Sequence, residues 1–126
     1  MKYQIKQHFQ IESARRLPHL PSTHPCSQVH GHSFKIILTL EGPLDPVLGW
    51  MMDYNDIAKV CKPTIEQIDH RYLNEVPGLE NPTSELLAFW IFNQLQPLFA
   101  KTTVGLQKVT VLETPFTECS YGHSTG

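Results

Sequence analysis

The sequence predicts one α+β domain built on an antiparallel sheet, and the order of its periodic segments is the main reason. Two segments that alternate polar and apolar residues come first, two segments with helical spacing follow, and at least one alternating segment lies near the C-terminus. Strands and helices grouped in this way are typical of an antiparallel sheet with helices packed on it. The length of 126 residues suits a single domain, residues 1–126, with one core.

The first two predicted strands cover residues 3–13 and 30–41. Apolar side chains occupy alternate positions of the first segment, which predicts a half-buried strand. In the second segment the apolar positions continue the face that begins with His30 and His32. Residues 16–29 hold three prolines and several small polar residues, so they are predicted to form a loop.

Two helices are predicted in the middle of the chain. The first follows Asp53, a favourable N-cap residue, and its apolar positions recur at helical spacing as far as Ile68. Pro63 interrupts this pattern, and we expect it to kink or restart the helix. The second helix is predicted to start within residues 81–85, with a proline in its first turn, and to end near Pro97. Its expected buried seam comprises Leu87, Ile91, Leu95 and Leu98.

The last predicted strand covers residues 107–113, where Val109, Val111 and Glu113 share one face. A sheet with so few strands leaves its edges open to other chains. An oligomer that continues the sheet from one subunit to the next would cover these edges. We therefore expect a homo-oligomer.

Composition and charge exclude several classes of function. The net charge is −2 and the basic residues are scattered, which argues against a nucleic-acid partner. No apolar stretch reaches the length of a membrane span, and the N-terminus does not resemble a signal peptide. The three cysteines form no paired framework, so a reducing, cytoplasmic location is expected.

The segment from Cys26 to His32 is the first candidate for chemistry. His30 and His32 point to the same face of the predicted strand, so both can reach one metal ion. A pair of ordinary half-buried histidines is the alternative, and the nearby Cys26 favours the metal site. Cys26 lies in the loop, where its thiolate could act as a base or nucleophile; otherwise it is a small buried residue. Cys61 fits a core position on the first helix, and the sequence does not decide the role of Cys119.

Two carboxylates are further candidates. Asp69 could orient His70 and make it a general acid or base, although both could equally be surface residues. Glu113 lies on the core side of its strand, where an unpaired carboxylate is costly. It could bind a ligand that presents two parallel N–H donors, such as the amidine edge of a pterin or guanine, or it could reach solvent at the strand end.

Taken together and in order, these segments resemble the tunnel-fold family of 6-pyruvoyltetrahydropterin synthase and its bacterial relative, 6-carboxy-5,6,7,8-tetrahydropterin synthase. The similarity covers nearly the whole chain without insertions. The short spacing from Cys26 to His30 resembles the carboxy branch of the family. The matching segments are Arg16-Leu17-Pro18-His19, Cys26 with His30-Gly31-His32, Gly49-Trp50 with Asp53, Asp69-His70 with Tyr72-Leu73-Asn74, residues 77–85, and Glu113-Thr114 with Tyr121.

The resemblance implies a tunnel fold (T-fold) of order β-β-α-α-β-β with two helices on one face of the sheet. It also implies trimers that close a β-barrel and stack into a homohexamer, and an active site at a subunit interface. The implied activity is that of a lyase. In the carboxy branch, 7,8-dihydroneopterin triphosphate is converted to 6-carboxytetrahydropterin with loss of acetaldehyde and triphosphate, on the route to queuosine. A pyruvoyl-type or side-chain-aldolase enzyme is the alternative, as is a pterin-binding paralogue that is poor in metal.

The resemblance also implies roles for individual residues. In the family, three histidines hold zinc, a cysteine with an Asp-His pair moves protons, and a glutamate anchors the pterin. These roles would fall on His30 and His32 for the metal. Proton transfer would fall on Cys26, Asp69 and His70, and the anchor on Glu113.

The chain departs from the family pattern at Arg15, which stands where the family has its first zinc histidine. A guanidinium has no lone pair to give to a metal and carries a permanent charge. Three interpretations follow. His19 or His24 completes the zinc site, or Arg15 itself acts as a fixed electrophile in a site with little or no metal. Alternatively, the change is an engineered or inactivating substitution, which the retained Cys26 and the other site residues argue against.

Overall fold

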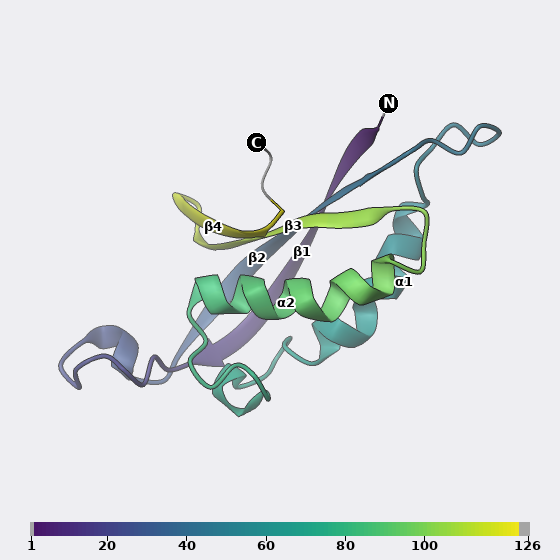
Figure 1. Cartoon of the computed structure of the whole chain (residues 1–126). Coiled ribbons are helices and arrows are strands. Elements are labelled where there is room, and N and C mark those ends of the chain that lie inside the picture. The colour runs from purple at the N-terminus through teal and green to yellow at the C-terminus, as the bar shows by residue number, and fades with distance from the viewer. Residues whose placement is uncertain (1, 124–126) are drawn as a thin grey trace.

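The computed structural model describes residues 2–123, which form a four-stranded antiparallel sheet with two helices on one face (Figure 1). The order of the strands in the sheet is β1-β2-β3-β4, the same as their order in the chain. This arrangement confirms the predicted fold class. The elements are β1 (Tyr3–Arg15), β2 (His30–Gly42), α1 (Tyr54–Glu66), α2 (Ser84–Phe99), β3 (Gly105–Thr114) and β4 (Thr117–Gly122), with short 3-10 helices at Pro25–Ser27 and Leu73–Glu75.

Strands β1 and β2 pair along their whole length and bring the candidate residues to one end of the sheet. The register runs from Tyr3 opposite Gly42 to Arg15 opposite His30. Odd positions of β1 and even positions of β2 therefore share the face that the helices cover. Ile11 and Phe34, which are opposite each other, are both fully buried there.

Strand β3 begins two residues earlier than predicted. A bulge in its pairing with β2 breaks the alternation of polar and apolar residues on which the prediction relied. Thr39 is opposite Lys108, but Leu40 is opposite Leu106, so the register shifts between them. This bulge lets Leu106 and Val109 face the same core although they are three positions apart. Strict alternation in the sequence therefore breaks at this point.

Helix α1 starts where predicted, and it does not restart at Pro63 as one of the two expected outcomes would have it. The Asp53 side chain accepts a hydrogen bond from the backbone N–H of Asn55 (2.8 Å), as an N-cap should. The helix continues through Pro63 to Glu66. Lys59, whose carbonyl loses its helical donor to the proline, is exposed together with Pro63, so water can satisfy that carbonyl.

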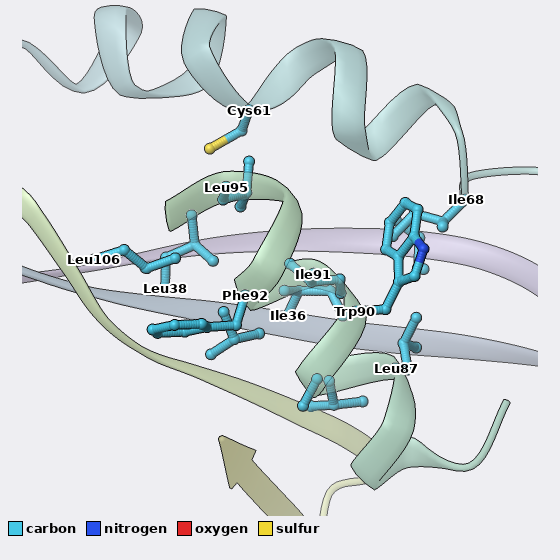
Figure 2. Close-up of a cluster of buried hydrophobic side chains, with 14 of the residues drawn as sticks. Ile36, Leu38, Cys61, Ile68, Leu87, Trp90, Ile91, Phe92, Leu95 and Leu106 are labelled. Atoms are coloured by element: carbon cyan, nitrogen blue, oxygen red, sulfur yellow. The ribbon is translucent and has the colours of Figure 1, made fainter. Parts of the chain in front are cut away.

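Helix α2 begins with Thr83 as its N-cap, whose hydroxyl accepts from the backbone N–H of Leu86 (3.1 Å). Pro82 thus lies before the cap and not in the first turn, contrary to the expectation. The predicted seam of the helix packs on the sheet, with Leu87, Ile91 and Leu95 fully buried (Figure 2). Over residues 2–123, neither helix is long and apolar enough to cross a bilayer.

Candidate functional site

The two histidines at the start of β2 lie side by side on the helix-covered face. The centroids of the His30 and His32 rings are 4.6 Å apart, and the next residue on this face, Phe34, lies 5.3 Å from His32. Nδ1 of His30 is 2.7 Å from the carbonyl oxygen of Gln28, whereas Nε2 of both rings is buried without a partner in the described structure. Burial lowers the pKa of His32, and the positive charge of Arg15 lowers it further, which favours the neutral form of the His32 ring.

Arg15 lies directly opposite His30 on β1, and only 1% of its surface is exposed. Its Nη2 is 2.8 Å from Oε1 of Glu113, and its Nη1 donates to the carbonyl oxygen of Pro82 (2.9 Å). The guanidinium carbon is 5.0 Å from the centroid of the Phe34 ring, a distance at which a cation and an aromatic face attract. Arg15 therefore ties the end of β1 to β3 and to the turn before α2.

Glu113 is the partner of this arginine, and its position on the core side of β3 agrees with the sequence pattern. Oε1 accepts from Ser84 at the start of α2 and from Arg15. Burial by itself raises the pKa of Glu113, but the hydrogen bonds from Arg15 and Ser84 outweigh that effect and hold the pKa below its usual value. Both contacts use Oε1, so Oε2 is left for a ligand.

Asp69 and His70 do face each other. Oδ1 of Asp69 is 2.9 Å from Nδ1 of His70. His70 has a positive φ of 57°, which turns the chain sharply at this residue. Adjacent side chains in extended or helical backbone would point apart, so this local conformation is what makes the pair possible.

The pair is held against β1 by backbone contacts along residues 68–74. Oδ1 of Asp69 accepts from the N–H of Glu12 (3.0 Å), and the N–H of His70 donates to the Glu12 carbonyl (2.6 Å). The N–H of Ala14 donates to the carbonyl of Arg71 (3.0 Å). Residues 68–74 thus cover the outer edge of β1 next to Arg15. Glu12 was not identified from the sequence, because nothing in its local pattern links it to residues so distant in the chain.

Cys26 lies in the 3-10 helix Pro25–Ser27, at the end of the long loop. Its carbonyl accepts from the N–H of Leu17 (2.9 Å), and its own N–H donates to Nδ1 of His24 (3.0 Å). These contacts fix the loop next to the start of β2, and the thiol is partly exposed. Cys26 remains a candidate for proton transfer.

An open pocket of about 580 Å³ brings part of the predicted site together. Its lining includes His32 of the two neighbouring histidines, His70 of the Asp69–His70 pair, and Tyr72. Glu113 lines two neighbouring pockets of about 340 and 280 Å³. Ser33 lines the first of these as well as the large pocket, so the two adjoin. Cys26 lines none of these pockets.

The ligand set for zinc is incomplete in the described chain. Within residues 2–123, no three His, Cys, Asp or Glu side chains lie close enough together to hold a metal ion. Neither His19 nor His24 therefore joins His30 and His32, and the position opposite His30 holds the Arg15 cation. The residues do not fit a zinc ion as the family pattern would place it.

The other two cysteines differ from Cys26. Cys61 is fully buried in the core, and burial raises its pKa to about 12, so it is a packing residue as the sequence indicates (Figure 2). Cys119 on β4 lines a pocket together with Glu113 and Ser84. Burial and the charges of Glu85 and Glu113 raise the pKa of Cys119, so it is held as a thiol. A thiol in this state is a poor nucleophile.

Comparison with known proteins gives similarity over nearly the whole chain. Residues 4–124 match the family described as 6-pyruvoyl tetrahydropterin synthase. The chain is 36% identical over 115 residues to the 6-carboxy-5,6,7,8-tetrahydropterin synthase of Synechocystis sp., which covers 87% of this chain and 85% of the relative. It is 37% identical over 90 residues to human 6-pyruvoyl tetrahydrobiopterin synthase, covering 68% of this chain and 60% of the human protein.

The fold has a close counterpart among solved structures. The structure of Caenorhabditis elegans 6-pyruvoyl tetrahydropterin synthase matches with a TM-score of 0.85 at 25% sequence identity, over 98% of this chain and 97% of the other. The match extends over the hairpin that carries Arg15, His30 and His32 as well as over both helices.

Proposed function

Because this chain belongs to the 6-pyruvoyl tetrahydropterin synthase family, we propose that it is a lyase that acts on a pterin triphosphate. The family membership confirms the resemblance inferred from the sequence. We propose the carboxy-branch reaction, in which 7,8-dihydroneopterin triphosphate and one water molecule give 6-carboxy-5,6,7,8-tetrahydropterin, acetaldehyde and triphosphate, as a step toward queuosine. Similarity to the Synechocystis synthase over most of both chains supports this branch.

The observation that carries the proposal is the pocket that His32 and His70 line together. In this pocket Asp69 holds the ring of His70 through Nδ1 (2.9 Å), which leaves Nε2 to give or take a proton. The reaction needs protons moved at the carbons and hydroxyls of the substrate side chain. Cys26 is the second proton-transfer residue of the proposal, since it lies in the loop that leads into His30.

Glu113 is proposed to anchor the pterin. Its depressed pKa keeps it ionised at neutral pH, as an acceptor for the N–H groups of the ring must be. Because Oε1 is already occupied by Arg15 and Ser84, the ligand has mainly Oε2 to bind. Replacing Glu113 with glutamine should therefore weaken pterin binding by roughly 2 kcal/mol, which calorimetry can measure.

Product analysis tests the function. The protein is incubated with 7,8-dihydroneopterin triphosphate, and the pterin and volatile products are identified by mass spectrometry. Acetaldehyde together with the 6-carboxy product supports the proposal. His70→Ala should abolish both products, whereas His8→Ala, a matched change of an exposed histidine on β1, should leave them unchanged. No turnover in the native protein would refute the function.

The second candidate is a pyruvoyl-type enzyme, which the similarity to the human 6-pyruvoyl tetrahydrobiopterin synthase favours. That reaction eliminates triphosphate and retains all the side-chain carbons, so it gives no acetaldehyde. Pterin binding with no product from either reaction would instead identify a binding paralogue.

Assembly and location belong to the same proposal. The N-terminal part of β1 and the strand β4 form the two edges of the sheet, where a second copy of the chain could pair. We expect a hexamer made of two trimers that close a barrel, and an active monomer in light scattering at low concentration would refute it. A cytoplasmic location agrees with three free cysteines. Zinc at His30 and His32, which the family resemblance implies, is not part of this proposal, because a third ligand is missing from the described chain.

A further inference from the structure

We propose that Arg15 takes the place of a metal ion in this site: it is the cation of the site, and its Nε–H, with Nε2 of His30 and His32, binds a hydroxyl group of the ligand. That the ligand is a pterin with a hydroxylated side chain rests on the proposed function. The exclusion of a metal by Arg15 is independent of the proposed function.

The first support is that Arg15 cannot withdraw from the site. One terminal nitrogen is 2.8 Å from Glu113 and the other donates to the Pro82 carbonyl at 2.9 Å, so β3 and the turn before α2 hold it from two sides. The side chain is 1% exposed and lies over the ring of Phe34. A guanidinium held in this way is a fixed charge and not a flexible surface cation.

The second support is a group of buried nitrogens that have no partner. Nε of Arg15 and Nε2 of His30 and His32 are all buried, and none of them makes a hydrogen bond within residues 2–123. Arg15 and His30 are directly opposite on neighbouring strands and share one face with His32. Buried polar atoms are normally satisfied, so three unsatisfied ones in one place indicate a site for a polar ligand.

The chemistry of these atoms matches a hydroxyl group. Nε–H of Arg15 is always a donor. Nδ1 of His30 lies 2.7 Å from a carbonyl oxygen, which can only accept, so the tautomer that donates from Nδ1 presents Nε2 as an acceptor. A hydroxyl accepts from Arg15 and donates to His30 at the same time. A phosphate or carboxylate could only accept, and the charge that would attract it is already neutralised by Glu113.

The same atoms argue against a divalent cation. Arg15 has no lone pair to offer to a metal, so only two imidazoles remain as ligands. A zinc site normally uses at least three protein ligands. A position that elsewhere in the family serves a metal would here be filled by the protein itself.

A zinc titration against a chromophoric chelator tests the exclusion of metal, without any pterin. Arg15→His should bind zinc at least 100-fold more tightly than the native protein, because a direct ligand contributes more than the roughly 10- to 100-fold of an outer partner. Arg16→His is the matched control, since Arg16 is exposed one position along the chain, and it should behave like the native protein. Equal zinc affinity in the native protein and Arg15→His would overturn the proposal.

Circular dichroism checks that Arg15→His folds. If Arg15→His does not fold because Glu113 has lost its partner, the double variant Arg15→His/Glu113→Gln removes the unpaired charge. The zinc affinity of the double variant is then compared with that of the native protein.

Binding of two pterins to the chelator-treated native protein tests the hydroxyl site. Neopterin carries a trihydroxypropyl side chain, whereas 6-methylpterin has the same ring without hydroxyls. The native protein should prefer neopterin by about tenfold, and Arg15→Lys, which keeps the charge but lacks Nε–H, should lose this preference. Equal affinity of the native protein for both would overturn the hydroxyl site. Binding of neither would overturn the pterin function and the hydroxyl site together, while the zinc titration alone still decides whether Arg15 excludes metal.

Discussion

Replacing Arg15 with leucine should lower the free energy of unfolding by about 3 kcal/mol. Removing one partner of a buried ion pair costs about 3–5 kcal/mol, because the other charge is left buried and unpaired. The Arg15 side chain is 1% exposed but that of Glu113 is 34% exposed, so water recovers part of the solvation of the carboxylate and the cost falls at the low end. The lost hydrogen bond to Pro82 adds about 1 kcal/mol, which is offset because leucine has no charge to desolvate on burial.

Urea unfolding of four proteins measures the pair directly: native, Arg15→Leu, Glu113→Gln, and the double variant. The concentration of protomer must be the same throughout, since assembly contributes to apparent stability. The double variant should lose about 2 kcal/mol less than the sum of the single changes, because it contains no unpaired charge. This coupling lies between the values of exposed and fully buried pairs.

A coupling below about 0.5 kcal/mol, typical of an exposed pair, would show that Arg15 and Glu113 are solvated independently. Arg15 would then be free to leave its place beside His30. Arg15 would then not be a fixed cation of the site.

Four further outcomes are expected. Cys26→Ala should reduce turnover by about 10²-fold without changing the circular dichroism spectrum, and near-normal turnover would remove this residue from the mechanism. Asp69→Asn should reduce turnover by about 10²-fold, because the ring of His70 loses the carboxylate that orients it through Nδ1; unchanged turnover would show that the pair is not used. Folding depresses the pKa of Glu113, so this carboxylate stabilises the folded state at pH values above its unfolded pKa of about 4.3. The stabilisation is lost as the pH falls through the lower pKa of the folded state. The urea midpoints of the native protein and Glu113→Gln should therefore converge at acidic pH. Thr83→Ala should lower the free energy of unfolding in urea by about 1 kcal/mol, because it removes the N-cap of α2. An unchanged free energy would show that water replaces the hydrogen bond of the cap.

Periodicity was sufficient to predict most of the sheet and both helices. Strands β1 and β2 carry most of their apolar residues at alternate positions, whereas the register that places Arg15 opposite His30, beyond the predicted end of the first strand, comes from the structure. Strand β4 was not recognised from its residues, because nearly all of its side chains are exposed and show no alternation. The start of β3 was missed because the bulge near Leu106 shifts the pattern by one residue.

The site was predicted only in part, for reasons of topology and local conformation. His30 and His32 lie where a strand pattern places them. The partner of Glu113 could not be predicted, since β1 and β3 are separated in the sheet by β2 and only the length of the arginine side chain bridges them. The contact between Asp69 and His70 depends on a positive φ that no residue type enforces here.

The contacts of residues 68–74 with the end of β1 have a consequence for the kinetics of folding. They join segments more than fifty positions apart, and the chain between them contains the loop, β2 and α1. Closing so long a loop is entropically unfavourable until the hairpin and helix have formed, so we expect these contacts to arise after the transition state. The pocket would then be the last part of the molecule to fold and the first to open. Hydrogen exchange of the Ala14 amide, which donates to Arg71, should accordingly be faster than that of amides in the middle of β2.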